Sequence, residues 1–368
     1  MRIRPVTQDD YPALNRLLSD VWFPTRSMAG WAWLLEQNPH QGDRPSGYVA
    51  CDTQNTILGF LGATGVELVN QRETLYATSG HSVVAAPQTP GAGVLLLRSL
   101  LQSDFGTAAY TLNNNALVQP IYDRLGGLPL SPQTADTTLN WITNHSLLAK
   151  AGFYRRYQRL RSFKTARSQG EQFARFELPD PAFSPSANHV KPCAFPFHDC
   201  PDLAHFWERL SSSEPFYMRR DTAALKWRFS NPDQTLDPIM FVFDRGNGVE
   251  GWLIAQVSKE TEISAPILTI VDLIALDDAV QSAYPTLVST AIEASRQMRL
   301  QRVQLPFADK ATINALKPLL KSSNIHKGHI HAHAKFHQNT DTDMLERNWR
   351  LTPFDGDFTY CLRQPPIV

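Results

Sequence analysis

The order of motifs in the first half of this 368-residue sequence is repeated in the second half. Residues 3–21 show a strand pattern, an acidic cap and an amphipathic helix, and residues 190–207 show the same succession. An Asn-Pro pair follows a Trp-containing segment at Asn38 and again at Asn231. A repeat on this scale predicts two copies of one α/β unit.

The joint between the two copies falls in residues 165–189, where Gly, Pro and Ser are frequent and hydrophobic periodicity is weak. We therefore expect one domain over residues 1–164, a linker over 165–189 and a second domain over 190–368. Antiparallel strand signals precede the helices in each half. The predicted fold class is α/β, of the α+β type, with each domain a mixed, mostly antiparallel sheet flanked by helices.

The charge balance and the cysteine content limit the possible partners and compartments. Thirty-five basic and 35 acidic residues cancel, so we expect no nucleic-acid partner and no anionic membrane partner. The four cysteines are scattered, which favours a reducing compartment over a disulfide framework. No apolar stretch approaches the roughly 20 residues that cross a bilayer. These features predict a soluble, cytoplasmic protein.

A glycine-rich turn at a helix N-terminus is the clearest local motif. A strand pattern at residues 81–85 leads into residues 88–93, Gln-Thr-Pro-Gly-Ala-Gly, and then into a leucine-rich helical pattern. The first amides of a helix have no acceptor within the helix, and the helix dipole adds partial positive charge there. Such a turn suits a pyrophosphate. The residues after Gly93 fit neither the dinucleotide fingerprint nor a P-loop.

A second motif follows at residues 107–127. A strand pattern ends in three asparagines, of which Asn115 caps a short helical pattern that contains Tyr122. The helical pattern stops at Leu125 and Gly126, where glycine favours a helix end.

Together the two motifs resemble the signatures of the GCN5-related N-acetyltransferase superfamily, in the same order. The first is the acyl-CoA loop, Q-x-x-G-x-G, at Gln88, Gly91 and Gly93, and the second is an Asn followed seven residues later by a helical Tyr and then by Leu-Gly. The sequence departs from the usual pattern at Gln88, which replaces a basic residue, at Pro90, which lacks an amide, and at Gly127, which replaces an aromatic. The resemblance implies two tandem acyl-CoA N-acyltransferase-like domains.

The resemblance also implies roles for single residues. Tyr122 would protonate the departing thiolate, although an ordinary packing role is the alternative. His81 is the first candidate for the general base, and Glu67, acting through a water, is the second. Backbone amides of a bulged strand would bind pantetheine and polarise the thioester. The expected cofactor-binding residues are Val83, Val84, Gln88, Gly91, Ala92, Gly93 and Asn115.

The second half does not repeat the glycine loop. After the strand pattern at residues 267–274, residues 276–285 contain no glycine but do contain Asp277 and Asp278, which would repel a pyrophosphate. We expect one acyl-CoA site per chain. Residues 219–229 and 349–357 look like the C-terminal halves of tandem members, with no chemistry that we can assign.

Two clusters raise the possibility of a metal site. His329, His331 and His333 alternate on one face of a strand pattern, but such positions lie too far apart for a compact tetrahedron, so a solvated strand face is the better interpretation. Cys193 and Cys200, with His198 between them, fit no common zinc spacing. We expect no metal.

The function expected from the sequence is acyl-CoA-dependent N-acyl transfer. The chain would move the acetyl group from acetyl-CoA to a primary amine, carried by a small molecule or a peptide, through direct attack in a ternary complex. Two alternatives stay open: a catalytically silent tandem binding protein, and an O-acyltransferase that uses the same cofactor site.

Overall fold

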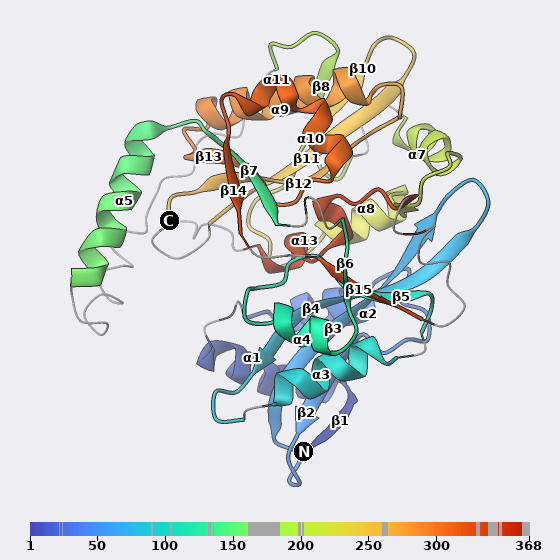
Figure 1. The fold of residues 1–368 in the computed structure, drawn as a ribbon, viewed down its shortest axis with the longest axis vertical. Helices are drawn as coiled ribbons and strands as arrows, with labels where there is room; N and C mark the ends of the chain where they lie inside the picture. Colours follow the sequence, from blue (N-terminus) through green and yellow to red (C-terminus); the bar gives the residue numbers. More distant parts are fainter. Residues whose placement is uncertain are drawn as a thin grey trace. The chain divides into compact units, whose positions relative to one another are not determined.

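The computed structural model describes residues 1–362 except 22, 24, 90, 104, 132, 133, 135, 161–184, 198, 199, 201, 260–263, 329–331, 338–344, 346 and 347. The described chain forms two compact units, each built from separate segments of the sequence (Figure 1). Unit 1 contains residues 1–136, 207–234 and 329–361, and unit 2 contains residues 137–206, 235–328 and 362–368.

The two units interleave along the sequence, because each takes segments from both halves. Residues 137–160, from the first half, lie in unit 2, whereas residues 207–234 and 329–361, from the second half, lie in unit 1. The domain bounds expected at 1–164 and 190–368 describe the two copies of the sequence repeat. They remain a prediction. Residues 165–184 of the expected linker lie outside the described residues.

Unit 1 is built on a mixed sheet in which the pair β4–β5 is parallel and the other pairs are antiparallel. Along the sheet its strands are β1 (Arg2–Pro5), β2 (Gly47–Cys51), β3 (Ile57–Val69), β4 (Thr74–Ala85), β5 (Ala108–Thr111), β15 (His333–Phe336) and β6 (Leu128–Pro129), with β9 (Tyr217–Met218) paired to β3. The strand β15 comes from the end of the chain and lies between two strands of the first half.

Alternation along the strands gives the sheet of unit 1 two apolar faces. Phe60 of β3 belongs to one buried cluster and its neighbour Leu61 to the other. The helix α1 covers the first face with Tyr11, Leu14 and Leu18, which have helical spacing. The unit's helical elements are η1 (Gln8–Asp10), α1 (Tyr11–Asp20), α2 (Met28–Glu36), α3 (Ala92–Leu101), α4 (Gln119–Arg124), α8 (Thr222–Phe229), η2 (Pro353–Asp355) and α13 (Phe358–Cys361).

Unit 2 repeats the same plan. In sheet order its strands are β14 (Asn324–Lys327), β7 (Thr137–Ile142), β13 (Arg302–Leu305), β12 (Ile267–Ala275), β11 (Val249–Ser258), β10 (Ile239–Asp244) and β8 (Val190–Cys193). Here β12–β13 is the parallel pair. Its helices are α5 (His145–Leu160), α9 (Val280–Gln297), α10 (Lys310–Ala315) and α11 (Lys317–Leu320), and α7 (Leu203–Ser211) contains the division between the units. The predicted fold class is confirmed.

The expectation that the scattered cysteines form no disulfides was wrong for one pair. Cys193, at the end of β8, and Cys200 are joined by a disulfide, because the turn that follows the strand brings their Cα atoms to 5.4 Å. Cys51 is buried and free. Separately, none of the helices in the described part of the chain is long and apolar enough to cross a membrane.

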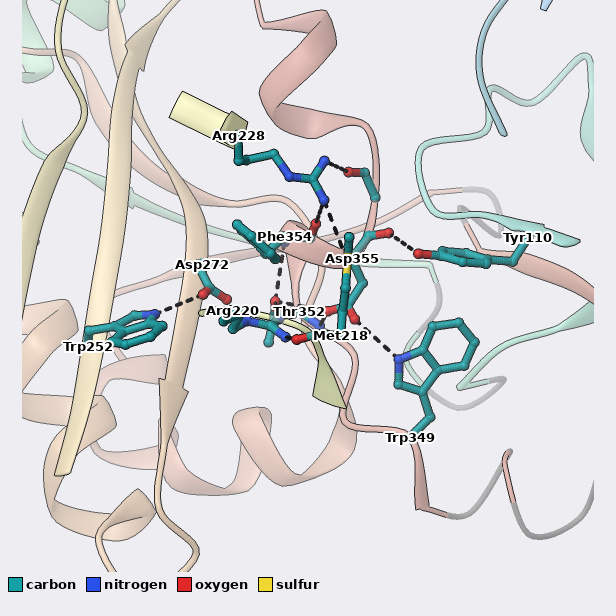
Figure 2. A network of polar contacts seen from close by, with 11 residues as sticks. Tyr110, Met218, Arg220, Arg228, Trp252, Asp272, Trp349, Thr352, Phe354 and Asp355 are labelled. Carbon is teal, nitrogen blue, oxygen red and sulfur yellow. Dashed lines mark hydrogen bonds and ion pairs between the residues drawn. The ribbon is translucent and has the colours of Figure 1, made fainter. Parts of the chain in front are cut away.

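A buried ion pair ties two segments of the second half together within unit 1 (Figure 2). The Arg220 side chain donates to Asp355 Oδ2 at 2.9 Å and to the Thr352 hydroxyl at 2.7 Å, and both charged residues are fully buried. Asp355 also accepts from the Trp349 indole, and its backbone carbonyl accepts from the Tyr110 hydroxyl on β5. These bonds fix the segment around η2 against the sheet.

Candidate active site

The strand β4 contains a β-bulge in its second half. Two of its residues, Ser82 and Val83, lie opposite the single residue Leu61 of β3. The φ angle of Ser82 is +53°, a left-handed conformation that bulged strands use. The bulge is the feature on which the expected roles of Val83 and Val84 depend.

The strands β4 and β5 part just before this bulge. Their parallel pairing covers Ala77, Thr78 and Ser79, and β4 then continues from His81 to Ala85 without β5 as a partner among the described residues. Backbone N–H and C=O groups on that edge of β4 therefore need other hydrogen-bond partners. An extended chain of amides, such as the pantetheine arm of a coenzyme A thioester, can supply them.

The glycine loop leads from the bulged strand into α3. Gly91 is the residue before the helix and has a φ of +94°, which glycine adopts without strain. A Cβ atom on Gly91 or on Gly93 would meet no other atom within 4 Å, so the backbone is open to a ligand on that side. Gln88 is exposed and Ala92 is buried in the core. Pro90 lies outside the described residues.

Asn115 and Tyr122 lie at the next helix, α4. The Asn115 side chain accepts from the amides of Leu117 and Val118, in the turn before the helix. The helix itself begins at Gln119 and has Val118 as its N-cap, so the expectation that Asn115 caps it was wrong. The Tyr122 ring is 1% exposed and stacks on the ring of His333, with centroids 5.2 Å apart. Burial raises the pKa of the Tyr122 phenol, against a hydrogen bond with Thr111 that lowers it. Tyr122 thus packs in the core, and its role as an acid remains a prediction.

The expectation of a solvated strand face was wrong for His333. This residue is fully buried on β15, with Nδ1 2.8 Å from the Asn114 side chain and Nε2 3.7 Å from Asp123. His333 is covered because β15 lies between β5 and β6. The alternation of side chains along one strand does not show which strands lie beside it. His329 and His331 lie outside the described residues, as does His198. No group of three or more metal-ligating side chains occurs among the described residues.

His81 is buried beside the point where β4 leaves β5. Its ring fills the space above Gly62 and lies 5.2 Å from the ring of Tyr360. Burial, together with the charges of Arg26 and Arg228, lowers the pKa of the imidazole to about 3. At neutral pH the ring is a weak proton acceptor in this conformation, and its role as the base remains a prediction.

Glu67, the second candidate base, lies in a different place on the sheet. It is five residues from Gly62, the partner of His81, which is about 17 Å along β3. Its carboxylate pairs with Arg219 and faces His40 Nδ1 at 3.6 Å. The structure does not bring the two candidate bases together.

Unit 2 contains the bulge but not the glycine loop. Val271 is the extra residue on β12, and the parallel pairing of β12 with β13 covers Leu268 and Thr269. Next to the bulge, the fully buried Asp272 accepts from the Trp252 indole at 2.8 Å. The residue before α9 is Ala279, where unit 1 has a glycine. One site per chain remains our prediction.

No model of a protein family and no curated protein matches the chain. Solved structures do match. A probable N-acyltransferase from Enterococcus faecalis, described as a conserved protein of unknown function, is 13% identical, with 90% of this chain and 71% of that chain covered and a TM-score of 0.53. A GCN5-related N-acetyltransferase from Anabaena variabilis is 12% identical, with 90% and 72% covered and a TM-score of 0.50.

A third match is N-myristoyltransferase from Saccharomyces cerevisiae with bound myristoyl-CoA, at 10% identity, 91% and 79% coverage and a TM-score of 0.53. At these identities the likeness shows the fold. The chain has the tandem fold of the GCN5-related N-acetyltransferases, as the two sequence motifs predicted.

The lowered pKa of His81 predicts a pH dependence of stability. The folded pKa, about 3, lies below the ordinary 6.5, so between these values the unfolded chain takes up a proton that the folded chain does not. Stability is then lost as the pH falls from 6.5, by at most about 1.4 kcal/mol per pH unit. Urea unfolding from pH 7.5 to 5 should show a steeper loss in the wild type than in His81→Gln.

The pH range above 7 is the control for the comparison of the wild type with His81→Gln. Above pH 7 the imidazole is neutral in both states, so the two proteins should respond to pH in the same way there. Equal slopes below pH 6.5 would contradict the buried, neutral state of His81.

Proposed function

We propose that the chain is an acyl-CoA-dependent N-acyltransferase that transfers an acetyl group from acetyl-CoA to a primary amine of a small molecule or peptide. The observation that carries the proposal is the succession of three features in unit 1. The strands β4 and β5 part after Ser79, β4 bulges at Ser82 and Val83, and the chain then turns at Gly91 into α3.

Each feature suits one part of an acyl-CoA molecule. The amides at the start of α3 would hold the pyrophosphate, helped by the helix dipole and by the open space at Gly91 and Gly93. The free edge of β4 near Val83 and Val84 would bind the pantetheine arm as a strand binds its neighbour. The thioester would then lie where β4 and β5 separate.

The reaction at that point is a direct acyl transfer. The amine nitrogen forms a bond to the thioester carbon, the carbon–sulfur bond breaks, and the amine loses a proton while the thiolate gains one. Backbone amides near Val83 would polarise the carbonyl, and holding both reactants together supplies much of the rate. The Tyr122 phenol is the proposed proton donor to the thiolate.

The similar structures support the class of cofactor. The Anabaena protein is named a GCN5-related N-acetyltransferase, and the yeast enzyme holds myristoyl-CoA. Both descriptions are of acyl-CoA chemistry on this fold, and they differ in acyl length. Acetyl-CoA is our proposal for this chain because its motif at residues 88–93 resembles the loop of the GCN5-related N-acetyltransferases.

Substitution of Gly93 tests the cofactor site. Gly93→Glu places bulk and negative charge in the proposed pyrophosphate site, so titration calorimetry should show acetyl-CoA binding at one site in the wild type and none in the variant. Gly93→Ala is the matched control and should keep binding, because a methyl group meets no atom there.

Unfolding cannot mimic this loss. Gly93 lies in the first turn of α3, where an acidic side chain is favourable and loss of glycine stabilises the helix by at most about 1 kcal/mol. The thermal midpoints of both variants should therefore equal or exceed that of the wild type. No binding by the wild type, or unchanged binding by Gly93→Glu, would contradict the proposal.

Tyr122→Phe tests the proton donor. The variant keeps the buried ring and removes the hydroxyl, so kcat should fall about 10²- to 10⁴-fold while acetyl-CoA affinity is unchanged. Tyr110→Phe is the control: its hydroxyl bonds the Asp355 carbonyl, so its loss should lower stability and leave the proton transfer intact. An unchanged kcat in Tyr122→Phe would assign this residue to packing.

A further inference from the structure

Tyr122, the proposed proton donor, is surrounded by protein, which makes its phenolate costly. The residue is 1% exposed, and burial raises the pKa of the phenol. A buried phenol acts efficiently as an acid only where a neighbouring donor stabilises the oxygen that loses the proton. The groups around Tyr122 therefore decide how well it can perform the proposed step.

Three polar side chains form a connected set beside Tyr122. Thr111, the last residue of β5, donates its hydroxyl hydrogen to the side-chain oxygen of Asn114. The side-chain nitrogen of Asn114 lies 2.8 Å from His333 Nδ1. Thr111 and His333 lie opposite each other in the pairing of β5 with β15. All three residues are buried.

The set contacts both the ring face and the hydroxyl of Tyr122. The His333 ring stacks on the Tyr122 ring, with centroids 5.2 Å apart and planes 16° from parallel. The Thr111 hydroxyl lies beside the phenol, and a hydrogen bond from it favours the phenolate and lowers the pKa of Tyr122. Thr111 thus has Asn114 as one partner and the phenol as the other.

The orientation of the Asn114 amide follows from His333. Asp123 Oδ1 lies 3.7 Å from His333 Nε2, and a carboxylate there favours the tautomer with its hydrogen on Nε2. Nδ1 is then an acceptor, so Asn114 turns its amide nitrogen toward His333 and its oxygen toward Thr111. The hydroxyl hydrogen of Thr111 is therefore held by Asn114 in the resting chain.

A threonine hydroxyl has one hydrogen and two lone pairs, so it can serve a neighbour in two ways. While Asn114 holds the hydrogen, the Thr111 oxygen can only accept from Tyr122, which keeps the phenol protonated. When Tyr122 protonates the thiolate, its O–H bond breaks, an S–H bond forms and the negative charge moves to the phenol oxygen. Rotation about the Cβ–Oγ1 bond then lets Thr111 donate to the phenolate.

We propose that Thr111 is a positioning residue for Tyr122, with a hydroxyl that accepts from the phenol at rest and donates to the phenolate after proton transfer. Asn114 holds the resting orientation, and His333 holds Asn114. The inference rests on the proposed acyl transfer and adds the group that stabilises the charge left on its proton donor.

A difluorinated tyrosine at position 122 tests the inference without an acceptor. The label keeps the shape of tyrosine and has a more acidic phenol, whose ionisation fluorine NMR follows during a pH titration. Thr111→Val removes the hydroxyl and keeps the shape, so it should raise the pKa of this phenol by about one pH unit, the size of one hydrogen bond. Thr111→Ser keeps the hydroxyl and should leave the pKa unchanged.

Asn114→Leu should move the pKa of the labelled phenol in the opposite direction. It removes the oxygen that holds the Thr111 hydrogen, which is then available to the phenolate, so the pKa should fall. Asn113→Ala, at an exposed position of the same turn, is the control and should leave the pKa unchanged. An unchanged or lower pKa in Thr111→Val, or a higher one in Asn114→Leu, would overturn the inference. If Asn114→Leu fails to fold, Thr111→Val decides.

Kinetics connects this hydrogen bond with the chemistry. Acetyl-CoA is the donor, glycinamide the acceptor, and release of the CoA thiol the readout. Thr111→Val should lower kcat about tenfold and leave acetyl-CoA affinity unchanged. In the Tyr122→Phe background the same substitution should change kcat by less than about twofold, because the phenol through which Thr111 acts is gone.

The inference and the proposed function fail in different ways. If acetyl-CoA is turned over and Thr111→Val keeps the wild-type kcat, the inference fails and the proposed function stands. If acetyl-CoA does not bind, the proposed function fails, and the fluorine titration alone then decides whether the Thr111 hydroxyl serves both states of the Tyr122 phenol.

Discussion

The candidate site depends on the separation of β4 from β5 after Ser79. A strand in the middle of a sheet normally pairs on both edges, and unpaired backbone groups at depth are costly. The bulge at Ser82 and Val83 turns this separation into a fixed feature, because it shifts the register against β3 and increases the twist of β4. The glycine turn and α3 follow directly from that bend. The result is a strand edge that runs without β5 as a partner, among the described residues, toward the N-terminus of α3.

Unit 1 is completed by distant parts of the sequence. The segments around α8 and η2 belong to unit 1, and the buried pair of Arg220 with Asp355 holds them together. That pair satisfies one arginine completely and leaves Arg228 with neutral partners. The cofactor site that we propose uses the first third of the chain, whereas segments from the second half complete the fold of unit 1.

Local features could be predicted from the sequence, and features that depend on distant pairing could not. Gly91 and the helix after it follow from short-range signals, since glycine permits a positive φ and leucine spacing marks a helix. The burial of His333 requires knowing that β15 lies between β5 and β6, more than 200 residues away in sequence. Glu67 looked like a free carboxylate because its partner Arg219 comes from the other half of the chain.

The most direct test is a crystal structure of the chain with coenzyme A. We expect the pyrophosphate about 3 Å from the amides at the start of α3, near Gly91 and Gly93, and the pantetheine arm along β4 past the bulge. Coenzyme A bound in unit 2 beside Ala279, or along another edge of the unit 1 sheet, would contradict it.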